Sequence, residues 1–251
     1  MHSVIRSIGT LLVLCSVSNM GMADEIKVLA GGAVQAGLIA AAPVFRSESR
    51  HEINAGYAIG SELLRRVASG EVLDIVIAPP AVVRELTQTG KVAADGQVDV
   101  GRVGAGVVAR NGAPLPDISS ADALKRSLLA ADSVIYNRAS SGVYIDTMLK
   151  KLGVYEKIES KITRYDDGVA VMHHLMKGKG REFGFGGITD ILLYRDQGLQ
   201  LVGPLPEEIQ NYTRYVAALT MVAPNPDAAK VLLRYLASVE GKALFAANGI
   251  R

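Results

Sequence analysis

The segment Ser61–Leu86 (SELLRRVASGEVLDIVIAPPAVVREL) decides the fold class of this chain. Residues 61–69 have the spacing of an amphipathic helix, with leucines and a valine on one face and two arginines on the other. The following run, LDIVIA at 73–78, is continuously apolar and is typical of a buried strand. The Pro79-Pro80 pair ends that strand, and residues 82–89 predict a second helix. A strand between two helices indicates βαβ units and a mainly parallel sheet.

The same alternation continues on both sides of this segment. Further strands are predicted at 25–29, 51–58, 133–136, 161–164, 183–186 and 199–202, and further helices at 35–47, 120–129, 142–152 and 168–177. Two longer strand segments, near 104–110 and near 212–222, separate a first βα block from a second one. The simplest topology sends the chain out to a second lobe through the first crossing and back through the second.

The predicted lobes follow from these two crossings. Residues 24–103 and 219–251 are expected to form the first lobe, to which the terminal helical region at 226–248 returns, and residues 104–218 are expected to form the second lobe. The predicted fold class is therefore α/β with two lobes.

The first 23 residues predict a secretory signal peptide and a periplasmic destination. Arg6 precedes an apolar stretch, and Gly21-Met22-Ala23 supplies the small residues of a cleavage site, which would leave 228 residues. The single cysteine, Cys15, lies in this segment, and Leu14 before it is the wrong size for a lipid-attachment signal. The remaining chain is then expected to have no disulfide and no cysteine-bound metal.

Charge and aromatic content argue against several classes of partner. The chain has 27 basic and 25 acidic residues and no tryptophan, so neither a basic field for nucleic acid or lipid headgroups nor a stacking platform is expected. His173 and His174 are adjacent and cannot share a metal at the usual helical spacing. No metal and no cofactor is expected.

Four junctions between a strand and a helix carry small or hydroxyl residues. They are Ala30–Ala33 (AGGA), Ala58–Ser61 (AIGS), Arg138–Gly142 (RASSG) and Asp166–Gly168 (DDG). A helix N-terminus offers unpaired N–H groups and the positive end of a dipole, which suit an anion. Several such ends facing one cleft would form a receptor for a small anion.

At this stage the chain resembles the periplasmic molybdate-binding type of solute-binding protein, a type II bilobal binding protein. The resemblance extends from about Ile26 to Ile250 and is carried by four segments: IKVLAGGAV (26–34), the opening segment (61–86), SSGVYIDTMLKKLGVYEKI (140–158) and YDDGVAVMHHLMKGKGREFGFGG (165–187). It implies two lobes of mixed sheets flanked by helices, joined by two crossing strands, with an anion in the cleft.

Carried over position by position, the family's ligand hydroxyl falls on Ser61 and its backbone donors near Ser141 and Asp167-Gly168. Two positions depart from the family pattern. Ala33 replaces the usual serine, and about Gly187 the molybdate binders have a tyrosine. Each hydrogen bond lost to a charged ligand costs roughly 1.5–3 kcal/mol, which argues against molybdate.

Two arginines flank the cleft loops and favour a larger carboxylate as the ligand. Arg138 precedes Ser140, Arg164 precedes Asp166, and a guanidinium fork matches a carboxylate with two hydrogen bonds. The alternative is that each arginine is solvated or pairs with a nearby aspartate. The candidate ligand-binding residues are Gly32, Ala33, Ser61, Arg138, Ser140, Ser141, Arg164, Asp167, Gly168 and Gly187.

Two functions are carried forward. The first is a monomeric periplasmic receptor that captures a small di- or tricarboxylate or oxyanion and delivers it to an ABC transporter permease. The second is an enzyme on the same scaffold, because some relatives resemble aconitate isomerase, which moves a proton within an unsaturated tricarboxylate. Such chemistry needs a general base, and the candidates are Tyr144, Glu62, Asp166 and Asp167. A sensor or adhesin-like binding role is a third reading.

Overall fold

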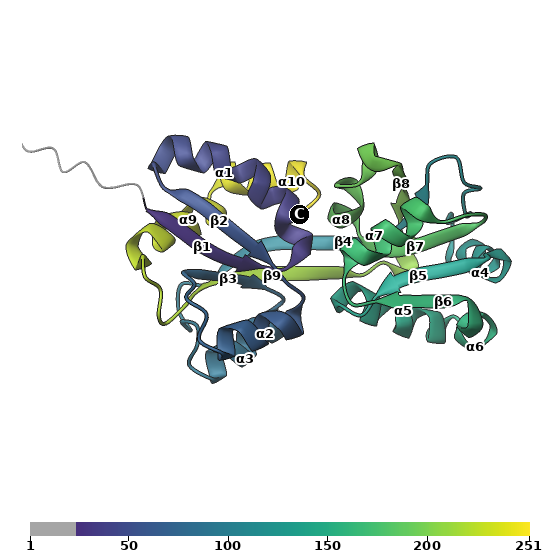
Figure 1. Cartoon of the computed structure of the whole chain (residues 1–251), viewed down its shortest axis with the longest axis horizontal. Coiled ribbons are helices and arrows are strands. Elements are labelled where there is room, and N and C mark those ends of the chain that lie inside the picture. The colour runs from purple at the N-terminus through teal and green to yellow at the C-terminus, as the bar shows by residue number, and fades with distance from the viewer. Residues whose placement is uncertain (1–23) are drawn as a thin grey trace, which may run out of the picture.

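The computed structural model describes residues 24–251, so the predicted signal peptide lies outside the described residues. The chain forms two groups of strands and helices that lie side by side and are linked by two long strands, β4 and β9 (Figure 1). In the described part of the chain, no helix combines the length and the apolar character that a membrane span needs.

The first lobe is built on a sheet with the strand order β2-β1-β3-β9. Its strands are β1 (Glu25–Ala30), β2 (Glu52–Tyr57), β3 (Ile75–Ala78) and β9 (Tyr212–Leu219). The first three strands are parallel, and β9 is antiparallel to β3. The apolar run predicted at 73–78 thus provides a central strand of this sheet, β3.

Helices cover both faces of the first sheet (Figure 1). They are α1 (Gln35–Ser49), α2 (Gly60–Ala68), α3 (Pro80–Gln88), α9 (Pro226–Ala237) and α10 (Val239–Ala247). Alternate residues of β1 point to opposite faces, so Val28 packs with α1, α9 and α10, whereas Leu29 packs with α2 and α3. Both apolar faces of the sheet are therefore buried.

The second lobe repeats this layered arrangement. Its strands are β5 (Ser133–Asn137), β6 (Ile162–Tyr165), β7 (Glu182–Gly187) and β8 (Leu199–Pro204). Its helices are α4 (Ala121–Ala130), α5 (Ser140–Lys151), α6 (Tyr155–Ile158), α7 (Gly168–Lys177) and α8 (Ile188–Leu192). Residues of α4, α5 and α6 pack into one apolar cluster of the lobe, and residues of α7 and α8 pack into another.

Strand β4 (Val98–Arg110) connects the two sheets. Its residues 98–104 pair with β9, and its residues 105–110 pair with β7 and β8. Because β9 pairs with β3 and with the first part of β4, residues 212–219 lie in the first sheet. The division of the chain at residues 104 and 218 stays a prediction.

The lobes also touch beside the crossing strands. Thr189 in α8 is buried, and its hydroxyl donates a 2.7 Å hydrogen bond to the carbonyl oxygen of Ala33 in the first lobe. Within the first lobe, Arg251 exchanges backbone hydrogen bonds with Arg102 of β4. The Thr189 bond therefore joins the start of α8 to the turn directly before α1.

Candidate functional site

A cavity of about 690 Å³ is lined by residues of both lobes. The first lobe contributes the segments that follow β1, β2 and β3, and the second lobe contributes the starts of α5, α7 and α8. Seven of the ten predicted ligand-binding residues line this cavity: Gly32, Ala33, Ser140, Ser141, Asp167, Gly168 and Gly187. The carboxyl ends of the parallel strands therefore meet at one hollow, as is usual for ligand sites in α/β sheets.

Helices α2 and α5 begin at the cavity, and their N-cap residues provide no side-chain cap. Their N-cap residues are Ile59 and Ala139, and neither side chain accepts a hydrogen bond from its helix. Helices α4 and α10 begin elsewhere, and the hydroxyls of Ser120 and Ser238 cap them at 3.1 and 3.0 Å. At α2 and α5, by contrast, no N-cap side chain takes up a first-turn amide.

The unpaired donors of α2 and α5 can be identified from the first hydrogen bond of each helix. In α2 that bond runs from the Leu63 amide to the carbonyl of Ile59, so the amides of residues 60–62 have no partner within the helix. In α5 the corresponding bond begins at the Val143 amide. The amides of Ser140 and Ser141 therefore also have no partner within their helix.

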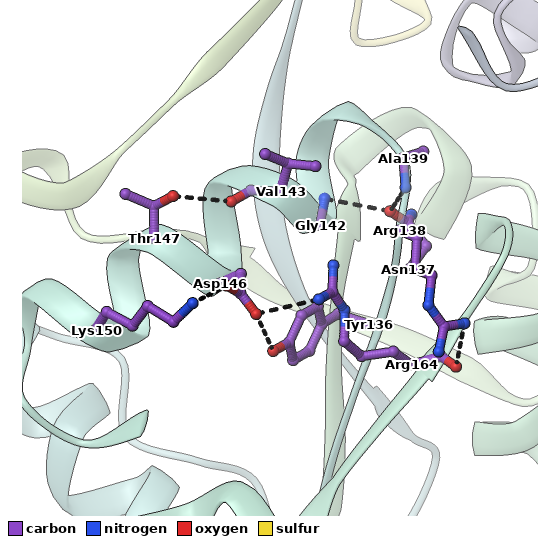
Figure 2. A network of polar contacts seen from close by, with 10 residues as sticks. All are labelled: Tyr136, Asn137, Arg138, Ala139, Gly142, Val143, Asp146, Thr147, Lys150 and Arg164. Carbon is purple, nitrogen blue, oxygen red and sulfur yellow. Dashed lines mark hydrogen bonds and ion pairs between the residues drawn. The ribbon is translucent and has the colours of Figure 1, made fainter. Parts of the chain in front are cut away.

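The side chain of Asn137, at the end of β5, fixes the start of α5. It is buried, and its side-chain oxygen accepts hydrogen bonds from the amides of Ala139 (2.9 Å) and Gly142 (3.2 Å). Figure 2 shows these two bonds. Asn137 also lines the cavity, and sequence reasoning missed it. An asparagine that ends an apolar strand directly before a small-residue loop was the available signal.

Asp167 caps α7, because its carboxylate accepts a 2.8 Å hydrogen bond from the Ala170 amide. The amides of Gly168 and Val169 precede this bond in the first turn, and both residues line the cavity. Helix α7 therefore adds a third set of first-turn donors.

Ser61 does not line the cavity, although its neighbours Gly60 and Glu62 do. It is the second residue of α2, and it is exposed. A ligand contact by the Ser61 hydroxyl stays a prediction.

Neither predicted arginine lines the cavity. Arg164 lies beneath α5, where its Nη1 is 3.2 Å from Asp146 Oδ1 and its guanidinium is 5.1 Å from the centre of the Tyr136 ring (Figure 2). Asp146 also accepts hydrogen bonds from Lys150 (2.7 Å) and the Tyr136 hydroxyl (3.2 Å). Burial raises the pKa of Asp146, but these two bonds and the Arg164 charge outweigh it, so the pKa is lowered.

Arg138 bridges two loops of the second lobe. Its Nη1 donates to the carbonyl oxygen of Arg164 at 2.9 Å and to Asp166 Oδ1 at 3.2 Å. It therefore ties the loop before α5 to the loop before α7. Among the cavity-lining residues of the described chain, the one lysine or arginine is Arg66, which is paired with Glu71.

Asp190 of α8 lines the cavity and was not predicted. It is half-buried, and within residues 24–251 its carboxylate has no hydrogen bond or ion pair. A methyl group built at Gly187, Gly168 or Gly32 would lie 3.1, 3.5 or 3.9 Å from a carboxylate oxygen of Asp190. Burial, and then the negative charge of Asp167, raises the pKa of Asp190 to about 7.

Two tyrosines share this part of the cavity. Burial and the Asp190 charge raise the pKa of both Tyr194 and Tyr215. By contrast, Tyr144, which was a candidate base, does not line the cavity and donates its hydroxyl to the carbonyl oxygen of Ile209 at 2.7 Å. Across residues 24–251, no group of three or more His, Cys, Asp or Glu side chains is arranged to hold a metal ion.

The chain matches known proteins in sequence and in fold. The profile of a family described as bacterial extracellular solute-binding protein matches residues 26–251. Over 231 residues, the chain is 29% identical to an aconitate isomerase from a Pseudomonas species. The alignment covers 90% of this chain and 87% of the isomerase.

Solved structures show the same fold at low sequence identity. The periplasmic molybdate-binding protein of Azotobacter vinelandii has a TM-score of 0.72 at 13% identity, covering 90% of this chain and 98% of that one. The sulfate-binding protein SubI of Mycobacterium tuberculosis has a TM-score of 0.73 at 17% identity, covering 91% and 86%. The predicted two-lobe α/β binding-protein fold is thus confirmed.

Proposed function

The chain belongs to the bacterial extracellular solute-binding proteins, and we propose that it binds a small di- or tricarboxylate between its lobes. The observation that carries this proposal is the set of first-turn amides from α2, α5 and α7 around one cavity. Such amides and the helix dipoles attract negative charge. Together with the predicted signal peptide, family membership supports capture in the periplasm and delivery to an ABC transporter permease, by a protein that acts as a monomer.

The size of the cavity and its lining favour a carboxylate over a compact oxyanion. About 690 Å³ is ample for a branched organic acid, and the donors come from both lobes, so they can reach carboxylates at different ends of one molecule. Ala33 and Gly187 offer no hydroxyl groups that could replace the hydration shell of molybdate.

The acidic residues around the cavity are compatible with an anion, because most of them are already engaged. Glu62 accepts hydrogen bonds from Arg65, Asp166 is paired with Arg138, and Asp167 caps α7. The exception is Asp190, whose pKa of about 7 leaves it neutral in mildly acidic solution. A neutral carboxyl can donate a hydrogen bond to a bound carboxylate.

Arg138 supports the site by holding two of its loops together. Its bridge between the loops before α5 and α7 holds two sets of amide donors at a fixed spacing, which lowers the entropy cost of binding. Direct contact of Arg138 or Arg164 with the ligand stays a prediction.

A thermal-shift screen of citrate, the two aconitates, smaller dicarboxylates, molybdate, tungstate and sulfate tests the proposal. A carboxylate at 100 times its dissociation constant should stabilise the protein by about 2.7 kcal/mol, which raises Tm by roughly 5–10 °C for a chain of this size. Ser141→Phe should abolish the effect by placing a ring over the first-turn amides of α5. The matched control Thr147→Phe, on an exposed part of the same helix, should retain it. Stabilisation by an oxyanion and by no carboxylate would contradict the proposal.

Isomerisation of aconitate is a second candidate, because the relative that carries that activity in its name aligns with 90% of this chain. The reaction moves a proton and a double bond, so it needs no oxidant and no reductant. Incubation with trans-aconitate, followed by chromatography of the cis product, tests it. Turnover would show that binding is followed by chemistry. Binding without turnover would contradict the isomerase function and favour the receptor function.

A further inference from the structure

We propose that Asp190 is the catalytic residue that takes a proton from the bound polycarboxylate and returns it, a role that rests on the carboxylate-binding function proposed above. Asp190 lies in the first turn of α8, and its carboxylate faces the cavity among glycines of both lobes, Gly32, Gly168 and Gly187. With no side chain on these three residues, a ligand carbon can approach the carboxylate oxygens.

The Asp190 carboxylate is free to react, unlike the other acidic residues at the cavity. The other candidate bases are engaged: Glu62 with Arg65, Asp166 with Arg138, and Asp167 with the first turn of α7. Within residues 24–251, the Asp190 carboxylate has no such partner.

The charges around Asp190 suit a base. The neighbouring titratable groups are Asp167 from the start of α7, Tyr194 beyond α8 and Tyr215 on β9. None of these side chains is cationic, so no neighbouring positive charge lowers the pKa of Asp190. A base is most effective when its pKa lies near the working pH, and burial brings the pKa of Asp190 to about 7.

The proposed step is balanced without any further reactant. A C–H bond of the methylene next to a carboxylate breaks, and its proton passes to an Asp190 oxygen. The electron pair left on carbon delocalises over the adjacent C=C bond and the carboxylates, whose developing charge the first-turn amides stabilise. The proton then returns from Asp190 to the far carbon of the three-carbon unit. One C–H bond has formed, one has broken, and the double bond has moved.

Deuterium exchange tests this role separately from binding. Trans-aconitate is incubated with the protein in D₂O, label entering the ligand carbons is followed by NMR, and the cis isomer is followed by chromatography. The wild-type protein should incorporate label. Asp190→Asn should do so about 100-fold more slowly or worse, the low end of what a general base contributes, while still showing a ligand-induced rise in Tm at pH 6. Asp196→Asn, on an exposed side chain nearby, is the matched control and should exchange like the wild type.

A measurement on the wild-type protein alone provides a second test if the asparagine variant does not fold. Exchange measured as kcat/KM should fall about tenfold per pH unit below about pH 7, because the ionised form of Asp190 is the base. A flat profile between pH 5 and 8 would overturn the role of Asp190.

The remaining outcomes separate the two proposals. Equal exchange in the wild type and Asp190→Asn overturns the catalytic role. Stabilisation by polycarboxylates without exchange or product in the wild type overturns it too, but leaves the binding function standing. If no polycarboxylate stabilises the protein, the binding function fails and the catalytic role fails with it.

Discussion

Replacing Gly142 with alanine is expected to destabilise the protein by about 3 kcal/mol or more and to abolish the ligand-induced rise in Tm. A Cβ at this position would lie 1.8 Å from the carbonyl oxygen of Asn137 and 2.6 Å from its side-chain oxygen. Helix α5 would have to move off the end of β5, which breaks the bonds from Asn137 to the amides of Ala139 and Gly142. Urea unfolding measures the first effect, and thermal shift measures the second.

The matched control for this prediction is Val143→Ala, one residue further along the same helix. The Val143 side chain is 57% exposed, so its truncation should change the free energy of unfolding by less than about 0.5 kcal/mol. If Gly142→Ala unfolds at the urea concentration of the wild type and still responds to carboxylates, the start of α5 is not the rigid donor described above.

The affinity for a carboxylate is expected to decrease as pH rises through 7. The pKa of Asp190 is raised to about 7, so the side chain is neutral below this pH and negatively charged above it. The charged form repels a bound polyanion, and the bound polyanion raises the pKa further, so binding takes up a proton. For trans-aconitate, whose carboxyls are ionised at both values, the dissociation constant should be about tenfold larger at pH 8 than at pH 6. Titration calorimetry measures it.

Asp190→Asn separates this effect from other pH dependences. It should bind with nearly the same affinity at pH 6 and pH 8, since the cavity carboxyl whose pKa is raised to about 7 is gone. In the ligand-free wild type, the raised pKa means that the native state holds a proton that the unfolded state releases, so stability should decrease between about pH 4 and 7. The variant should lack that decrease. An unchanged pH dependence in the variant would assign the effect to another group.

Much of the fold could be predicted from sequence, because each strand is a short apolar run between clear breaks. Strand β1 and helix α7 lie where their patterns placed them. Helix α3 begins at Pro80 and not at residue 82, since proline suits the first position of a helix. The terminal helical region is divided at Ser238, whose hydroxyl caps α10. Such boundaries depend on single capping contacts, which an apolar pattern does not encode.

The arginines show why a site is harder to predict than a fold. Arg164 directly precedes a cleft loop in sequence, yet it pairs in register with Tyr136 of β5 and shares its position beneath α5. Because successive residues of a strand point to opposite faces, the side chain is directed by register and not by its distance from the loop. Proximity in sequence therefore suggested a cation beside the cleft. The strand instead directs the Arg164 side chain toward Asp146.

Asp190 was missed for a different reason. Helix α8 has five residues, too few to give an amphipathic pattern. The importance of Asp190 comes from the glycines around it, which come from three separate segments, two in the second lobe and one in the first. Only the folded chain brings Gly32 within reach of this carboxylate. A lone aspartate in the sequence GGITD carries no such information.

Backbone amide NMR during titration with trans-aconitate at pH 6 tests most directly whether amides of both lobes hold one anion in one cavity. The amide resonances of Gly60 in the first lobe and of Ser141 and Gly168 in the second should shift together and saturate at one ligand concentration. Those of Ala121 and Val239, at the starts of the capped helices α4 and α10, should stay in place. Shifts confined to one lobe, or found only on the outer surface, would contradict the account.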